Sequence, residues 1–234
     1  MNRTTSAVLI AALFSVTLPV LAQSTEEPIS TDPGPIVTDR PTDSASPALV
    51  PHRTFQLETG YKFSRLETDG DRVDTQNFPD LLLRYGINDR VEVRAYGAGW
   101  TVQEDVQGKQ DGISDMSLGA KIALAPEKGN RPHMSLLVDV SLPIGHDDFT
   151  NHYAIPKVLF LASNTLTDRI ALTYNVGPSF VTADSQGEKN TNVDLNYAVA
   201  LSGSAGGPFT IFGELYGAFV SGSNRPDRHN FQAG

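Results

Sequence analysis

The sequence predicts an all-β fold, an antiparallel up-and-down transmembrane β-barrel, and three observations support this prediction. Apolar and polar residues alternate with a period of two along most of the chain after residue 54, as in strands with one apolar and one polar face. No window shows sustained helical periodicity. The composition agrees, since 20 Gly, 15 Pro and only 19% charged residues suit many strands joined by turns.

Residues 1–22 have the pattern of a cleaved secretory signal peptide. Arg3 is the only early charge, and the uncharged run from Ala7 to Leu21 contains Pro19 and is too short to span a bilayer as a helix. Small residues precede the expected cleavage before Gln23. The segment predicts export, and the absence of cysteine fits a bacterial envelope protein that folds without disulfides.

Residues 23–53 form a segment of different composition, which we call the leader. Prolines recur among Ser, Thr, Asp and Glu, and large apolar residues are few. Proline lacks a backbone donor and fixes φ, so neither a helix nor a sheet ladder runs through such a segment. We therefore expect a flexible periplasmic leader that is able to pack against something but makes no sheet.

Residues 54–234 carry the alternation and are predicted to form the barrel. Phe55, Leu57 and Thr59, for example, alternate with Gln56 and Glu58. A tenth strand is expected to begin near His229. The other nine predicted strands are 54–66, 77–85, 90–101, 112–124, 133–144, 153–165, 169–182, 192–204 and 209–219.

The connections between these strands alternate in length. Those after the second, sixth and eighth strands are tight, and the one after the fourth is fairly short. Those after the odd-numbered strands are longer and more polar, for example Val102 to Asp111 and Ala183 to Thr191. An antiparallel meander places all short connections at one end, which is typical of outer-membrane barrels with short periplasmic turns and longer extracellular loops.

Alternation alone does not say which face is inside. A soluble lipocalin-like barrel places its apolar face inward, around a ligand, and its polar face in water. Three features favour the membrane instead: the strands are long enough to cross the hydrocarbon layer when tilted, the polar face is rich in Gly, Ala and Ser rather than charge, and the two ends differ in loop length.

Several classes of function find no support in the residues. A net charge of −9 argues against nucleic-acid binding, and the absence of cysteine excludes thiolate sites. His146, Asp147, Asp148 and His152 have the spacing of a metal site, but a solvated extracellular loop explains them. No Gly-x-Ser-x-Gly turn is present, and no histidine lies at a clear inward strand position. We expect no catalytic residue, no metal and no cofactor.

Charged residues on the polar face are the one set that points to function. Acids and bases on neighbouring strands of a narrow barrel must pair or face water, so these residues either line a selective path or fill the lumen as a salt-bridged core. Arg84, Glu92 and Arg94 are expected to form a network beside the first tight turn. Tyr96 joins the set as a candidate for stacking on a solute. The predicted lumen-lining residues are Glu58, Lys62, Asp80, Arg84, Glu92, Arg94, Tyr96, Lys121, Asp139 and Glu214.

Eight short segments resemble, in order, the outer-membrane barrel transporters grouped as "putative MetA-pathway of phenol degradation". Residue 144 is Ile where that family often has Thr. The resemblance implies an outer-membrane location and about twelve strands, of which roughly nine and a half precede Gly234, so we expect a barrel that is incomplete at its C-terminal side. The matching segments are 39–41, 56–61, 82–86, 89–94, 112–121, 142–145, 174–177 and 214–217.

The expected function is therefore an outer-membrane channel or transporter for small molecules rather than an enzyme. Only the family's name suggests aromatic solutes. Two alternatives stay open: a structural or adhesive barrel with a filled lumen, and a soluble periplasmic ligand-binding barrel. The partners expected are outer-membrane lipid, a small solute and the machinery that assembles outer-membrane proteins.

Overall fold

The computed structural model describes residues 5–7, 36–40, 42–68, 71–185, 188–206, 209–221 and 227–234. In these residues the chain forms a sheet of 13 strands and a short 3₁₀ helix, η1 (Asp147–Phe149). No helix in this part of the chain is long and apolar enough to cross a lipid bilayer. The strands are β1 (Thr5–Ala7), β2 (Phe55–Thr68), β3 (Asp71–Asn88), β4 (Val91–Gly97), β5 (Trp100–Asp105), β6 (Gly108–Ile113), β7 (Met116–Ala125), β8 (His133–Leu142), β9 (Ile155–Thr167), β10 (Ile170–Ser185), β11 (Glu188–Gly206), β12 (Phe209–Val220) and β13 (Arg228–Ala233).

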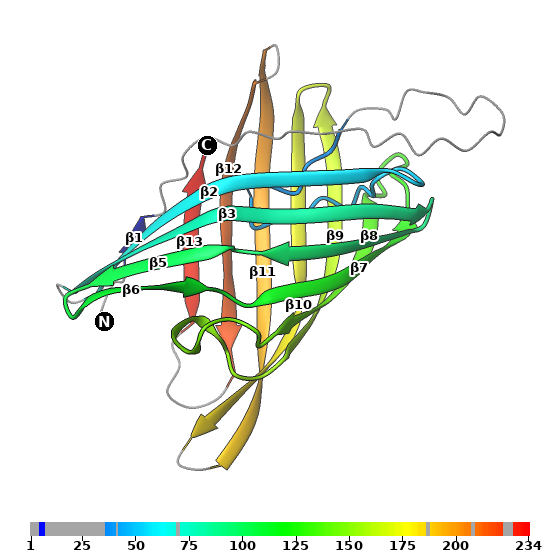
Figure 1. Cartoon of the computed structure of the whole chain (residues 1–234). Helices are drawn as coiled ribbons and strands as arrows, with labels where there is room; N and C mark the ends of the chain where they lie inside the picture. The colour runs from blue at the N-terminus through cyan, green and yellow to red at the C-terminus, as the bar shows by residue number, and fades with distance from the viewer. Residues whose placement is uncertain are drawn as a thin grey trace.

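The strands follow an antiparallel up-and-down order, as predicted. Neighbours along the chain pair with one another from β7 to β13 and from β2 to β4, and β4 pairs with β7. The β5–β6 hairpin lies between β4 and β7 in sequence and pairs with the first half of β3. In Figure 1, β2, β3, β5 and β6 run across the front while β9 to β13 stand upright behind them, so the curved sheet faces itself across an interior.

The two ends of the sheet differ. The links β3–β4, β7–β8, β9–β10 and β11–β12 lie at one end, which we call the turn end, and the remaining hairpins and loops lie at the other, the loop end. β2 and β13 do not pair directly. The three residues of β1 lie between them, antiparallel to β2 and in register with β13 at Ala7 and Phe231. Apart from β1, the predicted signal peptide lies outside the described residues.

All ten predicted strand regions contain strand, but three predicted loops are wrong. Residues 67–76 belong largely to β2 and β3, and the predicted strand 112–124 is divided between β6 and β7. Residues 102–111, expected as a polar loop, belong largely to the β5–β6 hairpin, and residues 183–191 extend β10 and β11. The predicted strand 90–101 is also divided, because the chain leaves β4 at Gly97 and resumes as β5 at Trp100. Backbone ladders need no apolar side chains, so hairpins continue beyond the alternating residues that revealed them.

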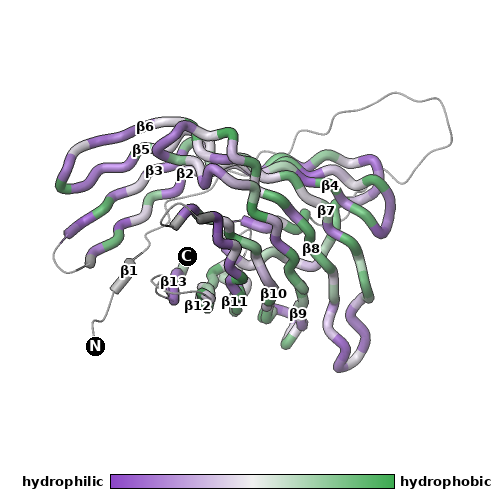
Figure 2. Tube along the Cα trace, turned by 90° about the horizontal axis from the view of Figure 1, so that it is seen from below, coloured by the Kyte–Doolittle hydropathy of each residue, from purple (hydrophilic) through white to green (hydrophobic). Residues whose placement is uncertain are grey.

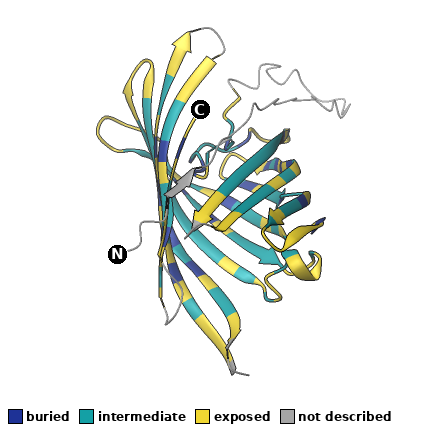
Figure 3. Ribbon diagram, turned by 90° about the vertical axis from the view of Figure 1, so that its left-hand side faces the viewer, coloured by how far each residue is buried: buried dark blue, intermediate teal, exposed yellow. Residues whose placement is uncertain are grey.

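The apolar row of each strand faces outward and the polar row faces inward. Val138 and Leu195 are 41% and 44% exposed, whereas Ala198 is 5% exposed and Glu58 is fully buried. Figure 2 shows hydrophobic and hydrophilic residues alternating along the strands, and Figure 3 shows exposed and less exposed positions alternating in the same way. This polarity is the reverse of a water-soluble barrel, whose outward rows are polar.

The described residues of the leader, 36–40 and 42–53, pack against the wall of the sheet. These residues lie inside the curved sheet, where Ala45 packs against Leu137 and Leu161 in a small apolar cluster. Their backbone groups bond to inward-facing side chains of the wall. The expectation that the leader adds no strand to the sheet agrees with its described residues, in which a single bridge joins His52 to Gly86.

Candidate functional site

The structure places the predicted lumen-lining residues on the inner face, at two depths. Six are at most 1% exposed: Glu58, Asp80, Arg84, Glu92, Lys121 and Glu214. Of these, Arg84, Glu92 and Lys121 lie within four residues of the strand ends at the turn end. Lys62, Arg94, Tyr96 and Asp139 are less buried and line a cavity nearer the loop end. The inner face is therefore divided into a buried turn level and a more open loop level.

Arg84 is the centre of the ionic contacts at the turn level. Its Nε and Nη2 donate to the two carboxylate oxygens of Glu92, each at 2.8 Å, and its Nη1 donates to Glu58 at 3.1 Å. The forked geometry makes this a strong charge-assisted pair. The predicted network is thus present between Arg84 and Glu92, and Arg94 joins it through the leader. Arg94 donates to Asp39 of the leader at 2.8 Å.

Acidic side chains of the wall hold the leader by its backbone N–H groups. Glu58 accepts from the backbone of Asp39 and Arg40 at 3.0 and 3.1 Å. Glu214 accepts from the backbone of Asp43 and Ser44 at 2.8 and 2.6 Å. Further along the leader, Glu92 accepts from the backbone N–H of Val50 at 2.8 Å. Carboxylates are acceptors only, so each needs donors, and the leader's main chain supplies them.

Cations and neutral polar groups hold the leader by its carbonyl groups. Lys121 Nζ donates to the carbonyls of Ser46 and Ala48 at 2.8 and 3.1 Å, and Arg84 donates to the carbonyl of Ala48 at 2.9 Å. Asn175 accepts from the backbone N–H of Ala45 at 2.7 Å and donates to its carbonyl at 3.0 Å. The wall thus binds the leader chiefly through its main chain, on opposite sides of the lumen.

Asp39 is the leader's main side-chain anchor. Its carboxylate accepts from Arg94 at 2.8 Å and from Lys121 at 2.9 Å, and lies 3.8 Å from Arg84. Burial alone would raise the pKa of this carboxyl, but Lys121, Arg84 and Arg94 lower the pKa far below its ordinary value. Asp39 is therefore charged and balances three wall cations. Its neighbour Arg40 pairs with Asp80 of β3.

Sequence reasoning missed the residues that the leader brings to the site. Asp39 and Asp43 were assigned to a flexible segment, and Asn175 carries no charge to mark it. One signal was present. A proline-rich extended segment leaves its N–H and C=O groups unpaired and free to bond elsewhere.

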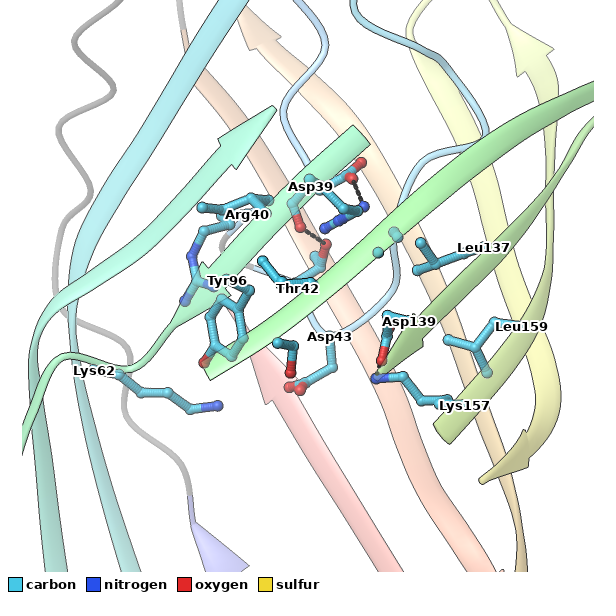
Figure 4. Close-up of a pocket in the computed structure, with 16 residues that line it drawn as sticks. Asp39, Arg40, Thr42, Asp43, Lys62, Tyr96, Leu137, Asp139, Lys157 and Leu159 are labelled. Atoms are coloured by element: carbon cyan, nitrogen blue, oxygen red, sulfur yellow. Dashed lines mark hydrogen bonds and ion pairs between the residues drawn. The ribbon is translucent and has the colours of Figure 1, made fainter. Parts of the chain in front are cut away.

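A cavity of about 180 Å³ lies on the loop side of the leader (Figure 4). Leader residues, including Asp39 and Thr42, form part of its lining, and Lys62, Tyr96 and Asp139 line it from the strands. A second cavity, of about 140 Å³, shares Asp43, Lys157 and Leu159 with the first and continues towards β10–β12. The leader thus lies between these spaces and the turn end.

The loop residues with metal-site spacing form no such site here. In the described residues, no group of three or more acidic or histidine side chains is placed to hold a metal ion. Instead, Asp115 fixes this loop by accepting from the backbone of Gly145 and Asn151 at 3.0 and 2.8 Å. His146 lies 6.4 Å, centroid to centroid, from the ring of Trp100. The contacts are those of a structured surface loop.

Comparison with known proteins gives one match. A family model described as "Putative MetA-pathway of phenol degradation" matches residues 38–234. The match includes most of the described leader as well as strands β2 to β13, and the family's description relates the chain to phenol degradation. No curated protein and no solved structure matches significantly.

Proposed function

The chain belongs to the family described as "Putative MetA-pathway of phenol degradation". Because its charged residues face inward and its apolar residues face outward, we propose that it is an outer-membrane channel for small molecules. The observation that carries the proposal is the burial pattern. Charged residues such as Glu92 and Lys121 are fully buried, while large apolar residues such as Leu118 and Leu215 are 49% exposed. A continuous apolar exterior is costly in water and is favourable in a bilayer.

The leader would close this channel at the turn level. There it contacts Arg84, Lys121, Asn175 and Glu214, which project from different sides of the wall. A solute moving between the loop end and the turn end would meet the leader, so passage requires the leader to shift. The proposal is thus a channel that is closed in the conformation described here.

A structural barrel with a permanently filled lumen is the second candidate. It is favoured by the same leader contacts, since buried charge pairs such as Arg84–Glu92 hold a segment firmly when all their partners are present. A soluble barrel is less well supported, because its outward rows would have to be polar.

Two experiments test location and conduction. Washed membranes should retain the protein at high salt, and Val138→Arg should destabilise it by about 2–4 kcal/mol at the bilayer midplane, whereas Ser117→Arg, on the inward face, should be tolerated. Release of the protein into the soluble fraction, or equal damage by both substitutions, would contradict the membrane proposal.

Solute flux into liposomes separates the channel from the filled barrel. Flux above that of empty liposomes supports a channel, and its absence supports the structural alternative. Orientation is tested separately, because an epitope inserted between Gln107 and Gln110, in the exposed tip of the β5–β6 hairpin, should be reached by antibody on intact cells, and one at Asn88 should not.

A further inference from the structure

The larger cavity has an uneven distribution of ion pairs. Seven charged residues line it, four cations and three acids, and three of the cations are paired. Arg94 pairs with Asp39 at 2.8 Å, Lys157 with Asp139 at 3.4 Å, and Arg40 with Asp80. The fourth cation is Lys62. The charged lining residues are Arg40, Lys62, Arg94, Lys157, Asp39, Asp43 and Asp139.

Lys62 has no counterion within the part of the chain that the structure describes. There it forms neither an ion pair nor a side-chain hydrogen bond. Its register partner on β3, Asn77, donates its side-chain amide to Thr101 at 2.6 Å. Figure 4 shows the amino group of Lys62 directed into the cavity on the side of Tyr96. An unpaired cation on a partly enclosed wall attracts an anion more strongly than one in open water.

The rest of the cavity offers apolar contact. Leu82 and Leu137 are 1% and 4% exposed and line the cavity together with Leu159 and the ring of Tyr96. A volume of about 180 Å³ is below the range of about 300–1,000 Å³ that holds drug-sized ligands. The space therefore suits a small molecule with one charged group and a short apolar body.

From this arrangement we propose that the loop level of the lumen binds a small organic monocarboxylate, with its carboxylate on Lys62 and its apolar body against Leu137, Leu159 and Tyr96. The inference deepens the proposed function and rests on it, since the cavity lies on the path that a solute would follow.

The acids of the cavity explain why the ligand carries a single negative charge. Asp139 is neutralised by Lys157 and leaves no cation free for a second carboxylate. Asp43 faces the same space and contacts Gln232 at 3.4 Å without a cation among its described partners. A dianion would therefore be repelled by Asp43, whereas a monoanion on Lys62 avoids it.

The test is calorimetric binding of benzoate to the purified full chain in detergent micelles, with benzamide as the uncharged molecule of the same shape. Benzoate should bind at least tenfold more tightly than benzamide, and added salt should weaken benzoate alone. Lys62→Gln should lower benzoate affinity about tenfold, and Lys62→Arg should keep it. Lys109→Gln, an exposed cation of β6, should change nothing.

A substitution that should raise the affinity for benzoate, instead of lowering it, sharpens the test. Asp139→Asn frees Lys157 from its ion pair and adds a second unpaired cation to the cavity, so benzoate affinity should rise several-fold. Equal affinities for benzoate and benzamide in the unmodified chain would overturn the inference without any variant. Unchanged benzoate affinity in a folded Lys62→Gln protein would overturn it as well.

The outcome is separable from that of the proposed function. Benzoate binding without flux into liposomes would leave the site in place and reject the channel. Flux without any preference for benzoate over benzamide in binding would leave the channel in place and reject the site.

Discussion

The turn level and the loop level of the lumen are built from the same strands yet differ in content. At the turn level, Arg84, Glu92 and Lys121 are fully enclosed and each contacts the leader or another charge. At the loop level, Lys62 and Asp139 are only partly buried and border empty space. The alternation along the strands is the same in both. The alternation determines which residues face inward, and the leader, which has no such alternation, determines which part of the interior is filled.

The largest expected effect is the difference in unfolding free energy between removing an acid at the turn level and removing one at the loop level. Asp39→Asn leaves Lys121 and Arg94 without their shared carboxylate and should cost about 3–5 kcal/mol of unfolding free energy, as expected for breaking a buried ion pair. Asp139→Asn breaks a pair whose lysine side chain is 36% exposed and should cost about 0–1 kcal/mol. Urea unfolding in lipid vesicles measures both, and equal costs would erase the distinction between the two levels.

A smaller effect should follow from crowding the point where the leader joins the wall. Gly86 lies under the leader so closely that an added methyl group would overlap the carbonyls of Val50 and Pro51. Gly86→Ala should therefore cost about 1–3 kcal/mol, in the range of overpacked sites. Gly213→Ala is the control, because its added methyl group would meet only the ring of Phe231, at 3.9 Å, and should be nearly neutral. Comparable losses in the two variants would show that the leader does not limit space at Gly86.

The smallest effect concerns acid pH. The pKa of Asp39 is lower in the folded chain than its ordinary value of 3.8, so its contribution to stability is complete above that value and declines as pH falls towards the lowered pKa. The stability difference between the unmodified chain and Asp39→Asn should therefore shrink by about 1 kcal/mol by pH 3. A difference that stays constant from pH 7 to pH 3 would indicate that Asp39 is not held charged by its neighbours.

Much of the sheet could be predicted from the sequence because alternation and tight turns are local signals. Strands β8 and β12 match their predicted boundaries within two residues at each end. Most of the β5–β6 hairpin was missed, since its residues are mostly polar and do not alternate with apolar ones, while its pairing with β3 depends chiefly on the backbone ladder. Which face points inward was left open by the alternation and was decided by the burial pattern.

The site was only half predictable for a similar reason. Inward charges such as Glu58 and Glu214 follow from strand periodicity, but several of their partners are main-chain groups of the leader, which no side-chain pattern marks. Proline content indicated that the leader makes no strand, but it did not indicate where the leader packs. Backbone groups that a sheet cannot use remain available to buried carboxylates and cations.

Closure of a conducting lumen by the leader can be tested with a reversible disulfide between the leader and the wall. Because the chain has no cysteine, Ala45→Cys with Asn175→Cys introduces one pair, at positions joined by two hydrogen bonds between the leader and β10. Conductance is then recorded in planar bilayers, with disulfide formation checked by mass spectrometry.

If the leader closes the lumen, the oxidised protein will be closed, reduction will produce channel openings, and reoxidation will abolish them. Equal conductance in the oxidised and reduced forms would contradict closure by the leader, because a leader fixed to β10 would then leave the path open.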